Sequence, residues 1–194
     1  MNFEQLEKEH GIQKAERLAF IDFRLRFTGV LNRSDITSQF GVADAAASKE
    51  ITNYRNLLPD NVDYERVFRA NKIQVASYKP LVNIRAETGL GMLANGFNKN
   101  MLSQKSLVPY ERVGMLRNAL KVEQVSAITR AIYMRCGASC HYLSASSARH
   151  GMRKLYPTAI FYDGQSWMFR ALNETDGRFK CFNFSRLLET QTNF

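Results

Sequence analysis

The sequence predicts an α+β protein whose first half is mainly helical and whose second half forms a small β-barrel. Apolar residues recur at helical spacing from residue 14 to about residue 56. From residue 139 onward, short alternating segments are separated by tight-turn residues such as Asp163-Gly164. Glycines scattered between the two halves predict a helical or irregular connector. We therefore expect three regions, residues 1–78, 79–120 and 121–194.

The first two predicted helices are separated by a short break. Residues 14–27 place apolar side chains on one broad face of the first helix. Residues 33–40 predict a short second helix, with Asn32 or Ser34 as its N-terminal cap. Gly41 is well suited to end this helix in a left-handed conformation.

The second and third helices together have the pattern of a helix-turn-helix. Asp44 is expected to cap a third helix over residues 45–56, and Pro59 marks its end. Small residues at the start of such a helix let it approach the base edges of DNA, although ordinary helical bundles also contain alanine-rich helix starts. We expect Val42, Ala47 and Ile51 to face inward and Ala46, Ser48, Lys49, Thr52 and Asn53 to face outward.

Residues 60–75 predict two short strands around a turn. Three helices followed by a β-hairpin describe a winged helix, and basic residues on the hairpin would lie within reach of phosphates. The predicted DNA-binding residues are Arg33, Ser34, Ala46, Ser48, Lys49, Thr52, Asn53, Arg55, Arg66, Arg69 and Lys72.

The second half consists of short segments that alternate or are rich in aromatic and β-branched residues. Turn residues at 163–164 and 175–177 separate antiparallel strands, which implies a small barrel. Residues 125–134 fit either a helix or an extended segment. The predicted strands cover residues 139–144, 155–162, 166–172 and 178–184, and residues 109–113 predict a strand leading into 115–120.

The positive charge of the chain lies mostly in this second half. The formal net charge is +9, with +1 over residues 1–80 and +8 over residues 81–194. A basic protein favours an anionic partner such as nucleic acid. A solvated basic surface without a partner would give the same count.

Several other functional classes receive no support from the sequence. No apolar stretch approaches the roughly 18 residues of a membrane span, and residues 1–7 are unlike a signal peptide, so we expect a cytoplasmic protein. Cys136, Cys140 and Cys181 are too few for a four-cysteine zinc site, so we expect buried, reduced thiols and neither a metal nor a cofactor. No histidine pairs with a serine or cysteine in a catalytic motif, so we expect no enzyme.

Hydroxyl groups and arginines recur between Tyr142 and Arg186 at strand spacing. Arg153, Arg170 and Arg186 lie on or beside different predicted strands, so a barrel could bring them to one rim that holds a phosphate. Trp167 or Tyr142 could stack a base; alternatively, Trp167 belongs to the barrel core and Arg186 to a surface ion pair. The predicted ligand-binding residues are Tyr142, Ser144, Ser146, Arg153, Trp167, Arg170 and Arg186.

These motifs make the second half resemble a WYL domain, an Sm-like (SH3-like) five-stranded barrel found in bacterial transcription regulators. The similarity rests on residues 142–147, 153–157, 163–171 and 182–187. The sequence departs from the family pattern at Ala148, Thr158 and Met168-Phe169. The resemblance implies a sensor that binds a nucleotide or single-stranded nucleic acid.

The first half resembles the winged helix that precedes WYL in repressors of BREX and CBASS phage-defence loci, on residues 47–54 and 58–64. Together the resemblances imply a homodimeric, ligand-responsive repressor that reads a palindromic double-stranded DNA operator. The resemblance also implies a C-terminal dimerisation domain, which we do not expect within these 194 residues. The alternative is an RNA-binding or scaffolding module that uses its barrel to bind single strands, without operator-specific duplex recognition; the near-neutral first half favours it.

Overall fold

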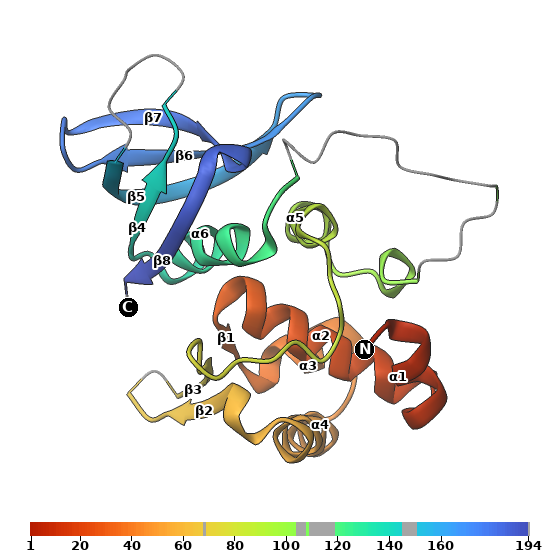
Figure 1. Ribbon diagram of the computed structural model, residues 1–194. Coiled ribbons are helices and arrows are strands. Elements are labelled where there is room, and N and C mark those ends of the chain that lie inside the picture. The colour runs from red at the N-terminus through yellow and green to blue at the C-terminus, as the bar shows by residue number, and fades with distance from the viewer. Residues whose placement is uncertain (68, 104–107, 109–118, 145–150, 194) are drawn as a thin grey trace. The chain divides into compact units, whose positions relative to one another are not determined.

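The computed structural model divides the chain into two compact units, residues 1–105 and 106–194 (Figure 1). It describes residues 1–67, 69–103, 108, 119–144 and 151–193. The strand predicted over residues 109–113 and the segment 115–118 lie outside these residues. Each unit is described by itself.

The helix-turn-helix of the first unit forms as predicted. Asn32 caps α3 through a capping box with Asp35, and Gly41 ends that helix in the left-handed region at φ 63°. The cap of α4 is Ala43 rather than Asp44, which is the first helical residue. The helices are α1 (Phe3–His10), α2 (Ile12–Thr28), α3 (Arg33–Phe40) and α4 (Asp44–Leu57).

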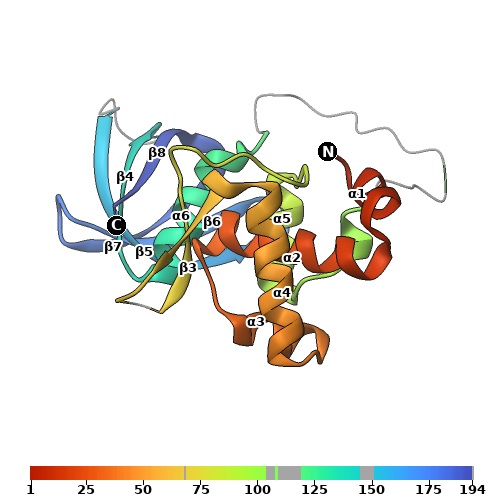
Figure 2. The same ribbon diagram turned by 90° about the horizontal axis from the view of Figure 1, so that it is seen from below.

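The core of α4 differs from the predicted one. Ala47 is buried as expected, but the other buried residues of this helix are Glu50 and Tyr54, and Ile51 is only half-buried. The helix packs against α2 (Figure 2), where Asp22 and Arg17 supply polar partners for Tyr54 and Glu50. Apolar periodicity alone could not reveal these buried polar pairings.

A three-stranded sheet completes the winged helix, in the order β1-β3-β2. The hairpin strands are β2 (Val62–Glu65) and β3 (Ala70–Ile73), which confirms the predicted wing, and the 3-10 helix η1 (Pro59–Asn61) leads into it. The two-residue strand β1 (Val30–Leu31), placed in the predicted break, pairs with β3 through Val30 and Lys72. At the wing turn, Arg69 takes an unusual positive φ of 50°.

Part of the predicted connector belongs to the first unit. Residues 86–95 form α5 (Ala86–Asn95), followed by the 3-10 helix η2 (Lys99–Met101). Gly89 brings the α5 backbone against the Phe27 ring, and Phe97 packs on Phe20 with ring centroids 5.2 Å apart. The glycines that suggested an irregular segment therefore include one that permits close helix packing.

Gly89→Ala is expected to destabilise the first unit by about 1–3 kcal/mol, because the added methyl group would overlap the buried Phe27 ring. Urea denaturation followed by circular dichroism measures this change. Gly91→Ala is the matched control, since its Cβ would approach only the flexible end of Met101, at 3.3 Å. Equal stability of the two variants would contradict the packing described.

The second unit contains a five-stranded antiparallel sheet in the order β7-β6-β5-β4-β8. Four of its strands were predicted, whereas β8 was not, and residues 122–134 are helical, which decides between the two readings of that segment. The elements are α6 (Val122–Met134), β4 (Gly137–Tyr142), β5 (Gly151–Tyr162), β6 (Trp167–Asn173), β7 (Arg178–Asn183), the 3-10 helix η4 (Phe184–Arg186) and β8 (Leu187–Asn193).

The small barrel that was predicted is present as a five-stranded antiparallel sheet, but within the described residues this sheet does not close. The edge strands β7 and β8 share no ladder. At the end of β7, the Asn183 amide donates to the Tyr142 hydroxyl of β4 at 3.0 Å. The sheet is therefore open between β7 and β8, although η4 connects these two strands in sequence.

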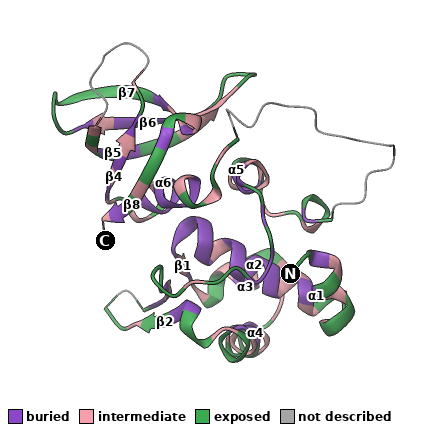
Figure 3. Cartoon of the chain, viewed as in Figure 1, coloured by how far each residue is buried: buried purple, intermediate pink, exposed green. Residues whose placement is uncertain are grey.

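An aromatic cluster and α6 cover the inner face of this sheet. Phe169 packs on Phe182 and Phe184, with ring centroids 5.4 and 4.9 Å apart. The Thr192 hydroxyl donates to the Ala127 carbonyl of α6 at 2.9 Å. Thr192 pairs with Ala138 of β4, and both residues are buried. Helix α6 therefore packs on the inner face of the sheet (Figure 3).

Candidate nucleic-acid interface

A buried carboxylate holds α4 to the rest of the first unit. Asp22 of α2 is fully buried and accepts hydrogen bonds from the hydroxyls of Tyr54, at 2.7 Å, and Tyr78, at 2.8 Å. The backbone amides of Leu81 and Val82 also donate to it, both at 3.1 Å. Burial raises the pKa of Asp22, and these four donors offset part of that rise. The same burial raises the pKa of Tyr54.

Asn61 extends this network to the wing. Its amide nitrogen donates to the Tyr54 hydroxyl, at 2.9 Å, and to the Lys79 carbonyl, at 2.6 Å, while its oxygen accepts from the Lys79 amide. Helix α4, the entry to the wing and the segment after it are thereby fixed to one another. No apolar pattern in the sequence indicated this network.

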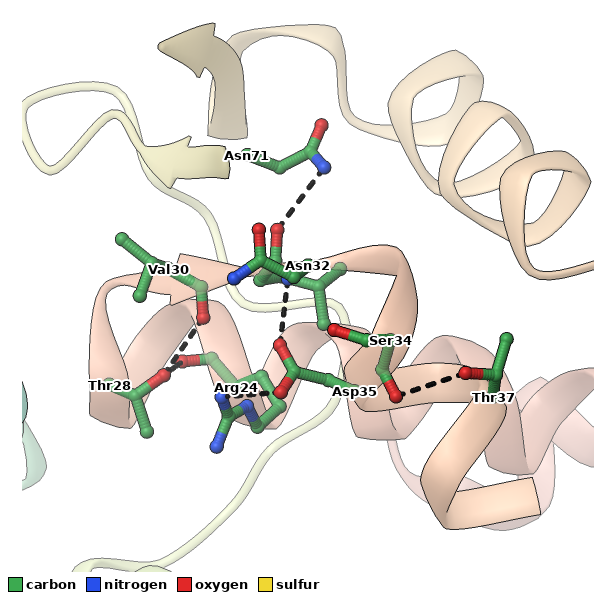
Figure 4. Close-up of polar contacts among 9 residues, drawn as sticks. Arg24, Thr28, Val30, Asn32, Ser34, Asp35, Thr37 and Asn71 are labelled. Atoms are coloured by element: carbon green, nitrogen blue, oxygen red, sulfur yellow. Dashed lines mark hydrogen bonds and ion pairs between the residues drawn. The ribbon is translucent and has the colours of Figure 1, made fainter. Parts of the chain in front are cut away.

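The start of α3 is fixed by a second set of polar contacts (Figure 4). The Asn32 amide donates to Asp35 at 2.7 Å, and Arg24 of α2 lies 3.1 Å from the other oxygen of Asp35. The Asn71 side chain of β3 donates to the Leu31 carbonyl at 3.2 Å. The turn between α2 and α3 is thus tied to both α2 and the wing.

Asn71 also orients a basic side chain of α4. Its oxygen accepts a hydrogen bond from the Arg55 guanidinium at 3.0 Å. Asn71 is buried, whereas Arg55 is exposed. The wing therefore holds one terminal nitrogen of the guanidinium of an exposed arginine.

Around Arg55 lies a groove of about 280 Å³ between the start of α3, α4 and the wing. Three of its lining residues are arginines, Arg33, Arg55 and Arg69. Arg33 contacts Ser48 of α4 at 3.5 Å and lies 3.6 Å from exposed Asp44. The groove is lined by Asn32, Arg33, Ser48, Ile51, Arg55, Tyr64, Arg69 and Asn71. Guanidinium groups around a concave polar surface suit phosphate oxygens.

The structure brings four of the predicted DNA-binding residues into this groove: Arg33, Ser48, Arg55 and Arg69. Lys49 and Thr52 are exposed on α4, Ala46 is half-buried there, Arg66 is exposed after β2, and Lys72 is half-buried on β3. Ser34 lines a different depression, between α2, α3 and α5. Sequence reasoning missed Asn32, Tyr64 and Asn71, because their role depends on the pairing of the wing.

Asn53 is turned toward its own helix. Its side-chain nitrogen donates to Glu50 at 3.1 Å, and the other Glu50 oxygen accepts from Arg17 of α2 at 3.3 Å. Asn53 is half-buried as a result. Its base-reading role stays a prediction.

The predicted ligand residues of the second unit divide between the two faces of the sheet. Tyr142 is buried on the inner face, edge-to-face with Phe182, and Arg153 lies 5.5 Å from its ring centroid. Cys140 lies beside them on that face, where burial raises its pKa to about 11. Arg170 follows buried Phe169, so it projects from the outer face. Arg153 and Arg170 therefore do not share one rim.

The other predicted ligand residues occupy separate positions. Trp167 is half-buried near the β5–β6 turn and packs on Tyr162 with ring centroids 5.2 Å apart, so it is not a fully buried core residue. Arg186 is exposed in η4. Ser144 is half-buried after β4, and Ser146 lies outside the described residues. The ligand site as a whole stays a prediction.

Of the three cysteines, Cys140 is buried, Cys136 is half-buried and Cys181 is exposed, so the prediction of buried thiols is wrong for Cys181. No helix in the described ranges is both long and apolar enough to cross a bilayer. Within the same ranges, no three His, Cys, Asp or Glu side chains group as metal ligands would.

Comparison with known proteins agrees with the two-part architecture. Residues 13–83 match the BrxR transcriptional regulator winged helix-turn-helix domain, and residues 123–192 match the WYL domain. The chain thus belongs to the class of proteins that join a BrxR-type winged helix to a WYL domain, which confirms the resemblance drawn from its motifs.

Within that class, the chain is homologous to the DNA-binding transcriptional repressor CapW. It is 32% identical to CapW of Escherichia coli (strain KTE188) over 189 residues, covering 90% of this chain and 60% of that protein. It is 32% identical to CapW of Pseudomonas aeruginosa over 179 residues, covering 88% and 58%, and 29% identical to CapW of Stenotrophomonas maltophilia over 182 residues, covering 88% and 58%. The chain thus spans about 60% of the length of these curated relatives.

Proposed function

We propose that this protein is a sequence-specific DNA-binding transcriptional repressor that uses α4 and the wing to bind duplex DNA. The observation that carries the proposal is the groove in which Arg33, Arg55 and Arg69 meet beside the exposed face of α4. Arginines at this position would hold the phosphate backbone, while Ser48, Lys49 and Thr52 approach base edges. Homology to CapW repressors supports the same function.

The second unit would act as the sensor. A nucleotide or single-stranded nucleic acid bound to the WYL domain would favour one arrangement of two winged helices in a homodimer and so change operator affinity. Paired units would read the half-sites of a palindrome. The resemblance to regulators of BREX and CBASS loci supports a phage-defence locus as the target.

Selection from a random duplex pool tests the proposed DNA recognition. The 194-residue chain is expected to enrich a discrete consensus, because α4 offers small and polar side chains that can reach base edges. Sequencing of the bound fraction after several rounds gives the result. A pool that stays random, at a salt concentration where the protein still retains DNA, would contradict sequence-specific recognition.

Lys49→Ala is the variant to compare in this selection, since Lys49 is exposed on α4 and its side chain forms no hydrogen bond or ion pair among the described residues. The variant should fold normally and fail to enrich the consensus. Enrichment of the same consensus by this variant would show that Lys49 does not contribute to base recognition.

A further inference from the structure

The outer face of the WYL sheet has an unusual composition. Along β6, the inner positions Phe169, Ala171 and Asn173 are buried, so strand alternation places Met168, Arg170 and Leu172 on the outer face. A sheet with one face on the core normally carries polar residues on the other face. On β6, two of the three outer positions, Met168 and Leu172, are apolar instead.

One row of this face is apolar across three strands and a second row across two. Leu172 pairs with Tyr156 of β5 and with Phe179 of β7, whereas Met168 pairs with Phe161 of β5 and with the polar Asn183 of β7. Tyr156 is 36% exposed and Phe179 is 52% exposed. We call this set, Tyr156, Phe161, Met168, Leu172 and Phe179, the outer platform. Helix α6 lies against the inner face and leaves the platform uncovered within the described part of this unit.

Two cations accompany the aromatic rings of the platform. The Arg170 guanidinium lies 5.3 Å from the centroid of Phe179, and Lys154 Nζ lies 5.7 Å from that of Tyr156. Lys154 also forms an ion pair with Glu174 at 2.7 Å. Arg170 has no ion pair among the described residues, so its charge remains available to a partner.

This chemistry distinguishes between two kinds of occupant. A second copy of the same face would bring two Arg170 side chains toward one another, and like charges in a poorly solvated contact are unfavourable. A single nucleic-acid strand instead offers flat bases for the exposed rings and phosphates for the guanidinium. Aromatic residues on an open sheet that stack successive bases are a known mode of single-strand recognition.

We propose that the outer platform binds single-stranded nucleic acid, with bases stacked on Phe179 and Tyr156 and a phosphate held by Arg170. The inference rests on the proposed sensing function for its biological role, and it assigns the effector to a surface that excludes Tyr142 and Arg153. Those two residues lie on the inner face. Of the ligand residues predicted from sequence, the platform uses Arg170.

Fluorescence anisotropy with a labelled oligothymidylate of about ten nucleotides, within the usual range of site sizes, tests the proposal on the whole chain. Excess unlabelled random duplex occupies the winged helix during the titration. Phe179→Ala should weaken oligothymidylate binding about tenfold, because stacking on an aromatic ring is lost. Arg170→Ala should weaken binding and reduce its salt dependence, whereas Arg170→Lys should keep the salt dependence.

Tyr133→Ala is the matched control, because it removes an equally exposed aromatic residue from α6, at 47% exposure. Its affinity for the oligonucleotide should equal that of the unchanged protein. The proposal is overturned if Phe179→Ala and Arg170→Ala bind with unchanged affinity, or if Phe179→Ala alters only self-association in sedimentation velocity. Because the assay reads binding directly, a failure to find an operator response would count against sensing and not against the platform.

Discussion

Replacing Asp22 with alanine is expected to lower the free energy of unfolding of the first unit by about 3–5 kcal/mol. The substitution leaves two tyrosine hydroxyls and two backbone amides without their acceptor in a fully buried site. Each unsatisfied buried donor costs about 1–3 kcal/mol when it cannot reach water. A loss of this size is a large fraction of the stability of a small domain.

Urea unfolding followed by circular dichroism gives the change for Asp22→Ala. Asp60→Ala is its matched control, because Asp60 is an exposed carboxylate of the same unit, and the expected change there is within about 0.5 kcal/mol. Tyr78→Phe should fall between them at about 1 kcal/mol, since it removes a single hydrogen bond to Asp22. An Asp22→Ala variant as stable as Asp60→Ala would show that the network does not hold α4.

Replacing Arg55 with alanine is expected to weaken duplex binding about tenfold for all sequences alike. Asn71 fixes one end of the guanidinium, at 3.0 Å, so little side-chain freedom is lost when a phosphate binds the other donors. Phosphate contacts carry no sequence information, so specificity should persist. The plot of log affinity against log salt should become shallower by about one unit.

Electrophoretic mobility shifts across a salt series measure both quantities. Arg85→Ala is the matched control, because Arg85 is an exposed arginine of the same unit that does not line the groove. Its removal lowers the net charge by the same amount but should leave the affinity nearly unchanged. Equal losses of affinity in the two variants would show that Arg55 affects binding only through the net charge of the protein.

Local signals in the sequence predicted the helix-turn-helix well, because its determinants are local. Asn32, Gly41 and Pro59 mark the ends of elements by rules that act within one turn. Helix α1 was not predicted, although Asn2 and Gln5 form a capping box at its start. Helix α5 was missed because its glycines suggested a loop.

The non-local features could not be predicted in the same way. The Asp22 network joins residues up to 60 positions apart, and a buried aspartate looks no different in sequence from an exposed one. Likewise, the alternation that separates Arg170 from Arg153 depends on strand register and on the bulge between Pro157 and Ala159. Sequence identified chemically suitable residues for the candidate sites, but only the pairing of strands determines which of them share a face.

Operator-specific duplex recognition by α4 and the wing is best separated from single-strand binding by one comparison. Dissociation constants of the unchanged protein and of Lys49→Ala are measured for the selected duplex and for a single-stranded RNA of the same sequence, across a salt series. We predict at least a hundredfold preference for the duplex, on the order of known specificity ratios, and loss of most of that preference in Lys49→Ala. An RNA bound as tightly as the duplex, with no effect of Lys49→Ala, would contradict the proposed function.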